Sequence, residues 1–221
     1  MAVASGFVEL LYGSKARGDA DASSDDDYVV ISDAPPAAEI RAAEASWYTW
    51  EEFEGMAEYG SLFLRHLRDE AVLARADHLG RQRLRSIMLN LPPYTRAGSD
   101  LESFFLAIED CQGALMMRDS SPSFELACLA TTARHASIVG CYLLGEPTFG
   151  RYKSIRRVVE LLGLPAEIAD DFPGLYRFKL ALAGRDNVAI ESGSWAEVEV
   201  WIGRVRSVVL EVSRCLVSSS V

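Results

Sequence analysis

The stretch GSKARGDADASSDDD, residues 13–27, decides the fold of this chain. It separates two short apolar runs, FVELLY at 7–12 and YVVIS at 28–32. Short runs of strand-forming residues around a polar, glycine-containing segment predict two strands joined by a long turn. A further apolar and aromatic run, AEASWYTW at 43–50, follows a brief connection. The beginning of the chain therefore predicts a small β-sheet.

The turn after the first strand carries residue types suited to binding phosphate. Gly13 and Ser14 can expose successive backbone N–H groups without obstruction from a Cβ atom, and Ser14 adds a hydroxyl. A helix beginning at 15–17 would direct its positive end at the same place. Asp25 and Asp27 stand two residues apart where the second strand starts, so extended backbone points both carboxylates to one side. This combination predicts a phosphate cradle beside a metal site.

Glu44, at the start of the third predicted strand, is the candidate third carboxylate. Three carboxylates from neighbouring strands suffice to hold two Mg²⁺ ions, or Mn²⁺ in their place. Asp26 alternates to the opposite side of the strand, and we interpret it as a surface residue.

Two plainer interpretations of the acidic stretch remain in view, a structural Ca²⁺ loop and an acidic surface turn. An EF-hand counted from Asp19 would need glycine at its sixth position and glutamate at its twelfth, where this chain has Ser24 and Val30. A nucleotide-binding Walker loop would need a Gly-Lys-Ser/Thr sequence, which does not occur. The spacing therefore favours the site with paired aspartates.

At these residues the sequence resembles the DNA polymerase β-like nucleotidyltransferase superfamily, in particular its minimal bacterial members. The family pattern Gly-Ser-x-Ala-Arg-Gly-x-Ala, followed by Ser-Asp-x-Asp, is matched by Gly13, Ser14, Ala16, Arg17, Gly18, Ala20, Ser24, Asp25 and Asp27. The resemblance implies transfer of a nucleoside monophosphate from an NTP, ATP above all, to an acceptor hydroxyl, with release of pyrophosphate. It implies nucleotide binding by Gly13 and Ser14 and binding of two Mg²⁺ by the aspartates. Asp26 departs from the family, which has an apolar residue there.

Arg17 has two possible roles within the same stretch. It can bind the nucleotide phosphates, or it can pair with Asp19 or Asp21 and stiffen the loop.

From about residue 51 the apolar period changes from two to 3.6, which predicts helices. Capping signals such as Ser99-x-x-Glu102, Ser121-Pro122 and Ser194-x-x-Glu197 mark several helix starts. The predicted helices cover 51–77 (one or two helices), a short stretch bracketed by Gly80 and Pro92-Pro93, 100–118, 121–144, 152–162 and 194–217. The expected fold class is α+β, with a small mixed-sheet nucleotidyltransferase domain over 1–55 and an all-helical bundle over 56–221.

The helical part resembles, more weakly, the HEPN-type bundles that accompany such transferases. HEPN ribonucleases have an arginine four to six residues before a histidine, and none of the three histidines here has one, so ribonuclease activity is not supported. In related two-domain transferases the helical part contacts the acceptor, and Arg134 and Lys153 are the candidates, Lys153 also for nucleotide binding. Either residue can instead cap or solvate a helix. His66 lies on an apolar helical face, and we interpret it as a core histidine.

Charge and composition limit the class to which the protein can belong. The net charge is −10, and residues 1–60 hold 13 acidic residues against three basic ones. Such an acidic region repels nucleic acid unless cations cover it, but it suits a hard cation. The four cysteines show no zinc-ligand spacing, and no run of 18 apolar residues or leader-like start occurs. We therefore expect a cytoplasmic enzyme without a membrane segment, for which apolar helical faces allow a homodimer.

Two functions from different classes remain open. The first is the Mg²⁺-dependent nucleotidyltransferase, whose acceptor is a small molecule, a protein or an RNA end. The second is a nucleotide-binding regulator or toxin–antitoxin component that acts by association with weak or no catalysis, which Asp26 motivates.

Overall fold

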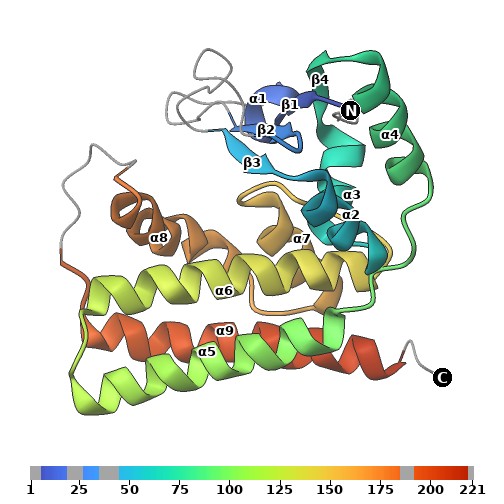
Figure 1. Cartoon of the computed structure of the whole chain (residues 1–221). Coiled ribbons are helices and arrows are strands. Elements are labelled where there is room, and N and C mark those ends of the chain that lie inside the picture. The colour runs from blue at the N-terminus through green and yellow to red at the C-terminus, as the bar shows by residue number, and fades with distance from the viewer. Residues whose placement is uncertain (1–5, 19–26, 35–44, 185–191, 219–221) are drawn as a thin grey trace. The chain divides into compact units, whose positions relative to one another are not determined.

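A computed structural model of the chain describes residues 6–18, 27–34, 45–184 and 192–218 (Figure 1). The chain divides into two compact units, Met1–Arg96 and Ala97–Val221. The first contains a four-stranded mixed sheet and the second contains helices, so the expected α+β class is confirmed. No helix within the described ranges is long and apolar enough to cross a bilayer.

The first unit is built around four strands in the order β3-β2-β1-β4. Strand β1 (Val8–Tyr12) is antiparallel to both β2 (Asp27–Ile31) and β4 (Val72–Ala76), whereas β3 (Ser46–Tyr48) runs parallel to β2. The first two strands and the short helix after β1 agree with the sequence prediction. Strand β4 does not, because residues 72–76 were expected to be helical.

Helices α2 (Trp50–Glu58) and α3 (Leu62–Glu70) bury their apolar faces against the sheet. The shared core consists of Val8, Leu10, Val29, Ile31, Trp50, Phe53, Leu64 and Leu67. Helix α2 begins at a capping box, in which Thr49 and Glu52 satisfy each other's backbone N–H groups. Burial of two aromatic side chains, Trp50 and Phe53, fixes α2 to the sheet.

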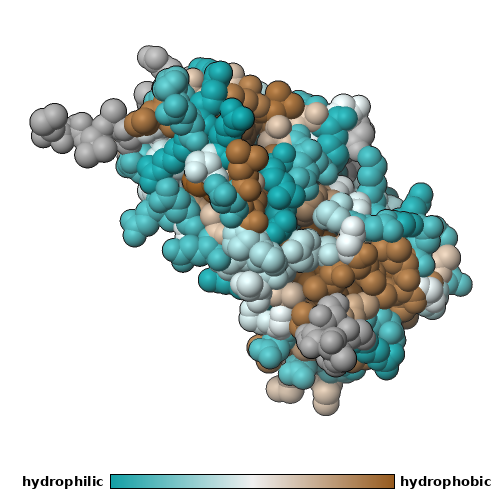
Figure 2. Space-filling view, turned by 90° about the vertical axis from the view of Figure 1, so that its right-hand side faces the viewer, coloured by the Kyte–Doolittle hydropathy of each residue, from teal (hydrophilic) through white to brown (hydrophobic). Residues whose placement is uncertain are grey.

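Helix α4 (His78–Leu89) completes the first unit. Its first turn is capped by Asp77, whose carboxylate also accepts a hydrogen bond from the backbone N–H of Phe7 at 3.0 Å. The helix is exposed at Arg81 and Arg85, and this face of the unit is largely hydrophilic with smaller hydrophobic areas (Figure 2). The first domain was expected to end at residue 55, whereas the compact unit extends to Arg96 because α2, α3, β4 and α4 pack on the sheet or pair with it.

The second unit is helical over its described residues. It comprises α5 (Ala97–Met117), α6 (Pro122–Leu143), α7 (Lys153–Leu162), α8 (Glu167–Leu182) and α9 (Trp195–Ser218). Helix α6 is central, since it packs against each of the other four. The predicted caps at Ser121 and Ser194 are confirmed, but Ser99 lies inside α5, and α8 was not predicted.

All four cysteines are free thiols. Cys111 and Cys141 are buried, and burial raises the pKa of the Cys141 thiol to about 11. These thiols therefore remain protonated near neutral pH.

Candidate functional site

The phosphate turn predicted from the sequence lies at the end of β1. The strand ends at Tyr12 and the short helix α1 (Gly13–Arg17) follows at once. Gly13 has a φ of 77°, in the left-handed region that favours glycine. In the antiparallel register Tyr12 pairs with Asp27, the first residue of β2. The turn and the second predicted aspartate are therefore neighbours, although 14 positions separate Gly13 from Asp27 in the sequence.

The side chain of Asp27 lies directly against Gly13. A Cβ atom built on Gly13 would stand 2.5 Å from Oδ2 of Asp27, closer than real Cβ contacts allow. The position thus requires glycine for two reasons, its φ and the carboxylate that occupies the space a side chain would need. The structure brings together the turn and one of the two predicted metal-binding aspartates.

Asp27 is at the rim of the apolar core. Residues paired across antiparallel strands share a face, so Asp27 follows Val29 and Ile31 along the side of β2 that faces the helices. Its pairing partner Tyr12 packs edge-on against the rings of Phe63 and His66 in α3, at centroid distances of 5.7 and 5.6 Å. The carboxylate is half-buried. Asp27 is thus a partly exposed acidic residue beside packed aromatic rings.

Arg17 connects the phosphate turn to α3. Its Nη1 lies 2.6 Å from Oε2 of Glu70, and Nε2 of His66 lies 2.9 Å from the same oxygen. The expected partners, Asp19 and Asp21, lie outside the described residues. Arg17 therefore has a structural ion pair, which holds α1 to α3.

The charge state of Glu70 follows from these contacts. Burial alone would raise the pKa of Glu70, but hydrogen bonds and charges from His66 and Arg17 outweigh it and hold the pKa below its ordinary value. The carboxylate is thus ionised near neutral pH. His66 is 9% exposed and has both a ring contact and a hydrogen bond, which confirms it as a satisfied core histidine.

Replacing Glu70 with glutamine is expected to lower the free energy of unfolding by about 1–3 kcal/mol near pH 7, since hydrogen bonds to charged groups contribute this much. Because the folded pKa lies below the ordinary 4.5, the stabilisation is present above pH 4.5 and is lost as the pH falls through the folded value. Urea unfolding of both proteins near pH 7 and at successively lower pH measures the difference. Glu58→Gln, at an exposed position, is the matched control and should change stability by under about 0.5 kcal/mol. A difference between wild type and Glu70→Gln that stays constant down to acid pH would contradict this account.

The remaining predicted site residues are placed as follows. Ser14 is half-buried in α1, next to Gly13. Lys153 is exposed at the start of α7, in the second unit. Asp25 and Glu44 lie outside the described residues, so of the three predicted metal ligands the structure describes Asp27. Among the described residues no cluster of three or more His, Cys, Asp or Glu side chains forms a metal site.

Sequence reasoning did not identify Glu70 or Tyr12 as part of this site. Glu70 had a local signal, because it follows His66 by four residues and so shares its helix face. Its pairing with Arg17 spans 53 positions and has no counterpart in sequence pattern. Tyr12 was predicted as a strand residue, and only the register shows that it faces Asp27.

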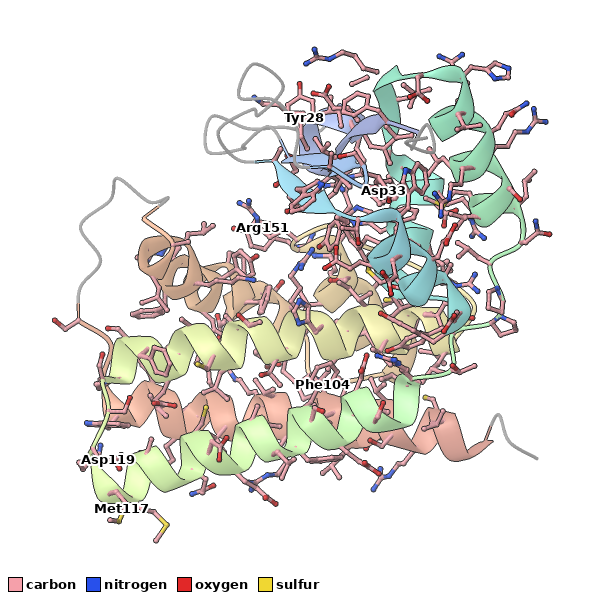
Figure 3. All side chains as sticks on the ribbon, in the orientation of Figure 1. Tyr28, Asp33, Phe104, Met117, Asp119 and Arg151 are labelled. Carbon is pink, nitrogen blue, oxygen red and sulfur yellow. The ribbon has the colours of Figure 1, made fainter. Side chains whose placement is uncertain are left out.

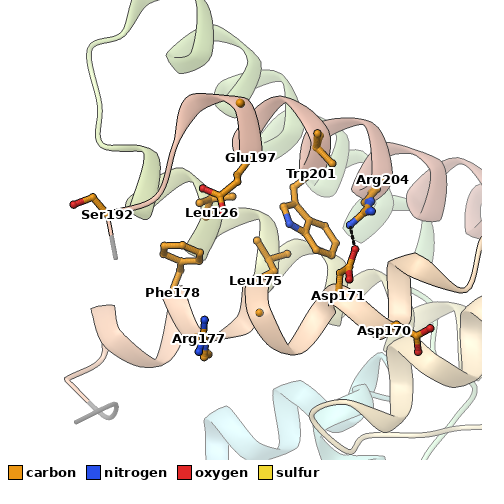
Figure 4. A pocket seen from close by; sticks show the side chains of 13 residues that line it. Leu126, Asp170, Asp171, Leu175, Arg177, Phe178, Ser192, Glu197, Trp201 and Arg204 are labelled. Atoms are coloured by element: carbon orange, nitrogen blue, oxygen red, sulfur yellow. Dashed lines mark hydrogen bonds and ion pairs between the residues drawn. The ribbon is translucent and has the colours of Figure 1, made fainter. Parts of the chain in front are cut away.

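The second unit has a cavity of about 960 Å³ between α8, α9 and the start of α6 (Figure 4). Leu175 and Phe178 of α8 and Trp201 of α9 form its apolar part. Arg204 and Asp171, which also line it, form an ion pair of 2.8 Å. None of the site residues predicted from the sequence lines this cavity.

No protein-family model matches the chain, and no curated protein is detectably similar to it.

Proposed function

We propose that the first unit transfers a nucleoside monophosphate from an NTP to an acceptor hydroxyl. One observation carries the proposal, the position of the Asp27 carboxylate against Gly13 at the end of β1. A phosphate turn and a metal-binding carboxylate have to be adjacent for a cation to bridge protein and phosphate. On this basis we also propose membership of the polymerase β-like superfamily that the motif resembles.

The residues that would hold Mg²⁺ are Asp25, Asp27 and Glu44. The cradle at Gly13, which a Cβ atom would fill, supports the fit at Asp27. Asp25 and Glu44 lie outside the described residues, so their place in this set rests on the motif; β3, parallel to β2, begins two residues after Glu44. When bound, Mg²⁺ would neutralise phosphate oxygens and favour departure of pyrophosphate.

The chain's own groups have separate tasks in this proposal. Backbone N–H groups at Gly13 and Ser14, with the Ser14 hydroxyl, would bind the β- and γ-phosphates. Arg17 positions α1 through Glu70, so we assign it to positioning rather than to phosphate contact. In the reaction the acceptor oxygen bonds to the α-phosphorus, the α–β bridging P–O bond breaks, and the acceptor hydroxyl loses its proton.

The test is transfer of radiolabel. The full chain is incubated with each α-³²P-labelled NTP, Mg²⁺ and a panel of small-molecule, protein and RNA acceptors, with and without EDTA. We expect the acceptor to become labelled and unlabelled pyrophosphate to be released, with ATP as the best donor. Chelation of the metal should abolish both products. Label transfer that survives EDTA would contradict the metal assignment. Metal-dependent NTP binding in calorimetry, with no turnover across the panel, would favour the nucleotide-binding regulator instead.

A further inference from the structure

Two cationic side chains of the second unit lie over tyrosine rings, and a third, Arg134, contacts the carbonyl of Phe149, two residues before Arg151. We call Arg134 of α6, Arg151 ahead of α7 and Lys179 of α8 the cationic surface. The Arg151 guanidinium lies 5.9 Å from the ring centroid of Tyr152 and 5.5 Å from that of Tyr176, and Nζ of Lys179 lies 5.4 Å from the Tyr176 ring. The two rings meet edge-on at 5.8 Å. Cation–π contacts at these distances orient both cations without neutralising them.

Other arginines of the same unit form ion pairs with carboxylates, and the three members of the cationic surface differ from them in this respect. Arg157 pairs with Glu146 and Glu160, and Arg204 pairs with Asp171. Within the described ranges, no member of the cationic surface forms an ion pair with a carboxylate.

Arg134 adds a third positive charge. Its Nη2 donates a hydrogen bond of 3.2 Å to the carbonyl oxygen of Phe149, and its Nε is buried without an acceptor. A buried N–H without a partner is costly, and because this Nε is closed to solvent Arg134 offers an anion its positive charge and not this donor.

The start of α7 strengthens the positive potential. The first turn of this ten-residue helix has no acidic residue, and its N-cap, Tyr152, makes no capping hydrogen bond through its side chain. Exposed Lys153 follows directly. Basic residues at the positive end of a helix are unfavourable on their own, and a bound anion would reverse this. Arg151 lies on the side of α6 that α7 and α8 cover (Figure 3).

We propose that the cationic surface binds the phosphodiester backbone of single-stranded nucleic acid. The three cations come from three separate segments, each is partly exposed, and none of them lines the cavity between α8 and α9, so they can contact a ligand that extends over several segments. Small anions gain affinity chiefly from enclosure, whereas a polymer gains it by placing successive phosphates on separate cations. A flexible single strand can adapt to this spacing. Because the net charge of the chain is −10, attraction has to come from this local cluster.

The experiment measures fluorescence anisotropy of a short fluorescein-labelled uridine oligoribonucleotide with the full chain at about 50 mM salt, without divalent metal. We expect Arg151→Ala with Lys179→Ala to weaken binding by about tenfold or more, and log K to fall with log salt with a slope of about −2 for three phosphate contacts. Arg157→Ala with Arg204→Ala is the matched control, since it removes the same number of cations from ion pairs elsewhere. The exchange Arg151→Lys with Lys179→Arg keeps the charge and should keep binding.

Four outcomes would overturn the proposal. These are no binding at low salt, binding unchanged by the first double variant, an equal loss in the control, and binding of tripolyphosphate with none of the oligonucleotide. The assay uses neither NTP nor metal, so its result is independent of nucleotidyl transfer.

Discussion

Asp27→Asn is expected to lower nucleotidyl transfer by about 10³-fold, close to 4 kcal/mol in the activation free energy. Asparagine keeps the shape of the side chain beside Gly13 but removes the charge, and a neutral amide is a poor ligand for Mg²⁺ next to phosphate. Asp25→Asn should have a similar effect. Initial rates of label transfer over a range of Mg²⁺ concentrations measure both.

Asp26→Asn is the matched control for these variants. It makes the same change of charge at the position between the two proposed ligands, and the sequence alternation predicts a side chain that points to the opposite side. We expect transfer to change less than about threefold. Equal losses for Asp26→Asn and Asp27→Asn would show that overall acidity, and not a defined ligand, controls the activity.

The part of the fold nearest the motif was predictable because its signals are local. Apolar runs of five or six residues predict β1 and β2, and the glycine between strand and helix predicts the turn at Gly13. The capping residues Ser121 and Ser194 fix the starts of α6 and α9 in the same way. Each of these features depends on a few consecutive residues.

Other parts were not predictable because they depend on distant partners. Strand β4 is exposed along most of its length, so it lacks the alternation that marks a half-buried strand, and it forms by pairing with β1. Helix α8 contains Pro173, which ordinarily interrupts a helix, yet Phe172 and Leu175 on either side of it are buried. The domain boundary moved for the same reason, since tertiary packing decides to which unit α2 to α4 belong.

Gly13→Ala is expected to abolish most transfer activity, with a loss of about 10²-fold or more, because displacing the Asp27 carboxylate by even 1 Å misplaces a reacting group. Gly18→Ala is a control supplied by the same turn. Gly18 has a φ of 75°, close to the 77° of Gly13, but a Cβ atom there would meet nothing within 4 Å. Both variants incur the strain of a left-handed alanine, about 1–2 kcal/mol, so Gly18→Ala should lose that much stability and keep most of its activity. Label transfer and urea unfolding of the two variants separate backbone strain from the close contact.

Gly13→Ala should lower the free energy of unfolding more than Gly18→Ala does. We expect the Asp27 carboxylate to cause this difference. Asp27→Ala removes Oδ2, the atom that a Cβ at Gly13 would meet at 2.5 Å. In that background we expect the two glycine substitutions to cost nearly the same, whereas beside the native aspartate they should differ by about 1–3 kcal/mol. Urea unfolding of the four single and double variants gives the coupling energy without any assay of function. If the difference persisted in the Asp27→Ala background, the glycine would be accommodating something other than this carboxylate, and the contact that carries the proposed function would be lost with it.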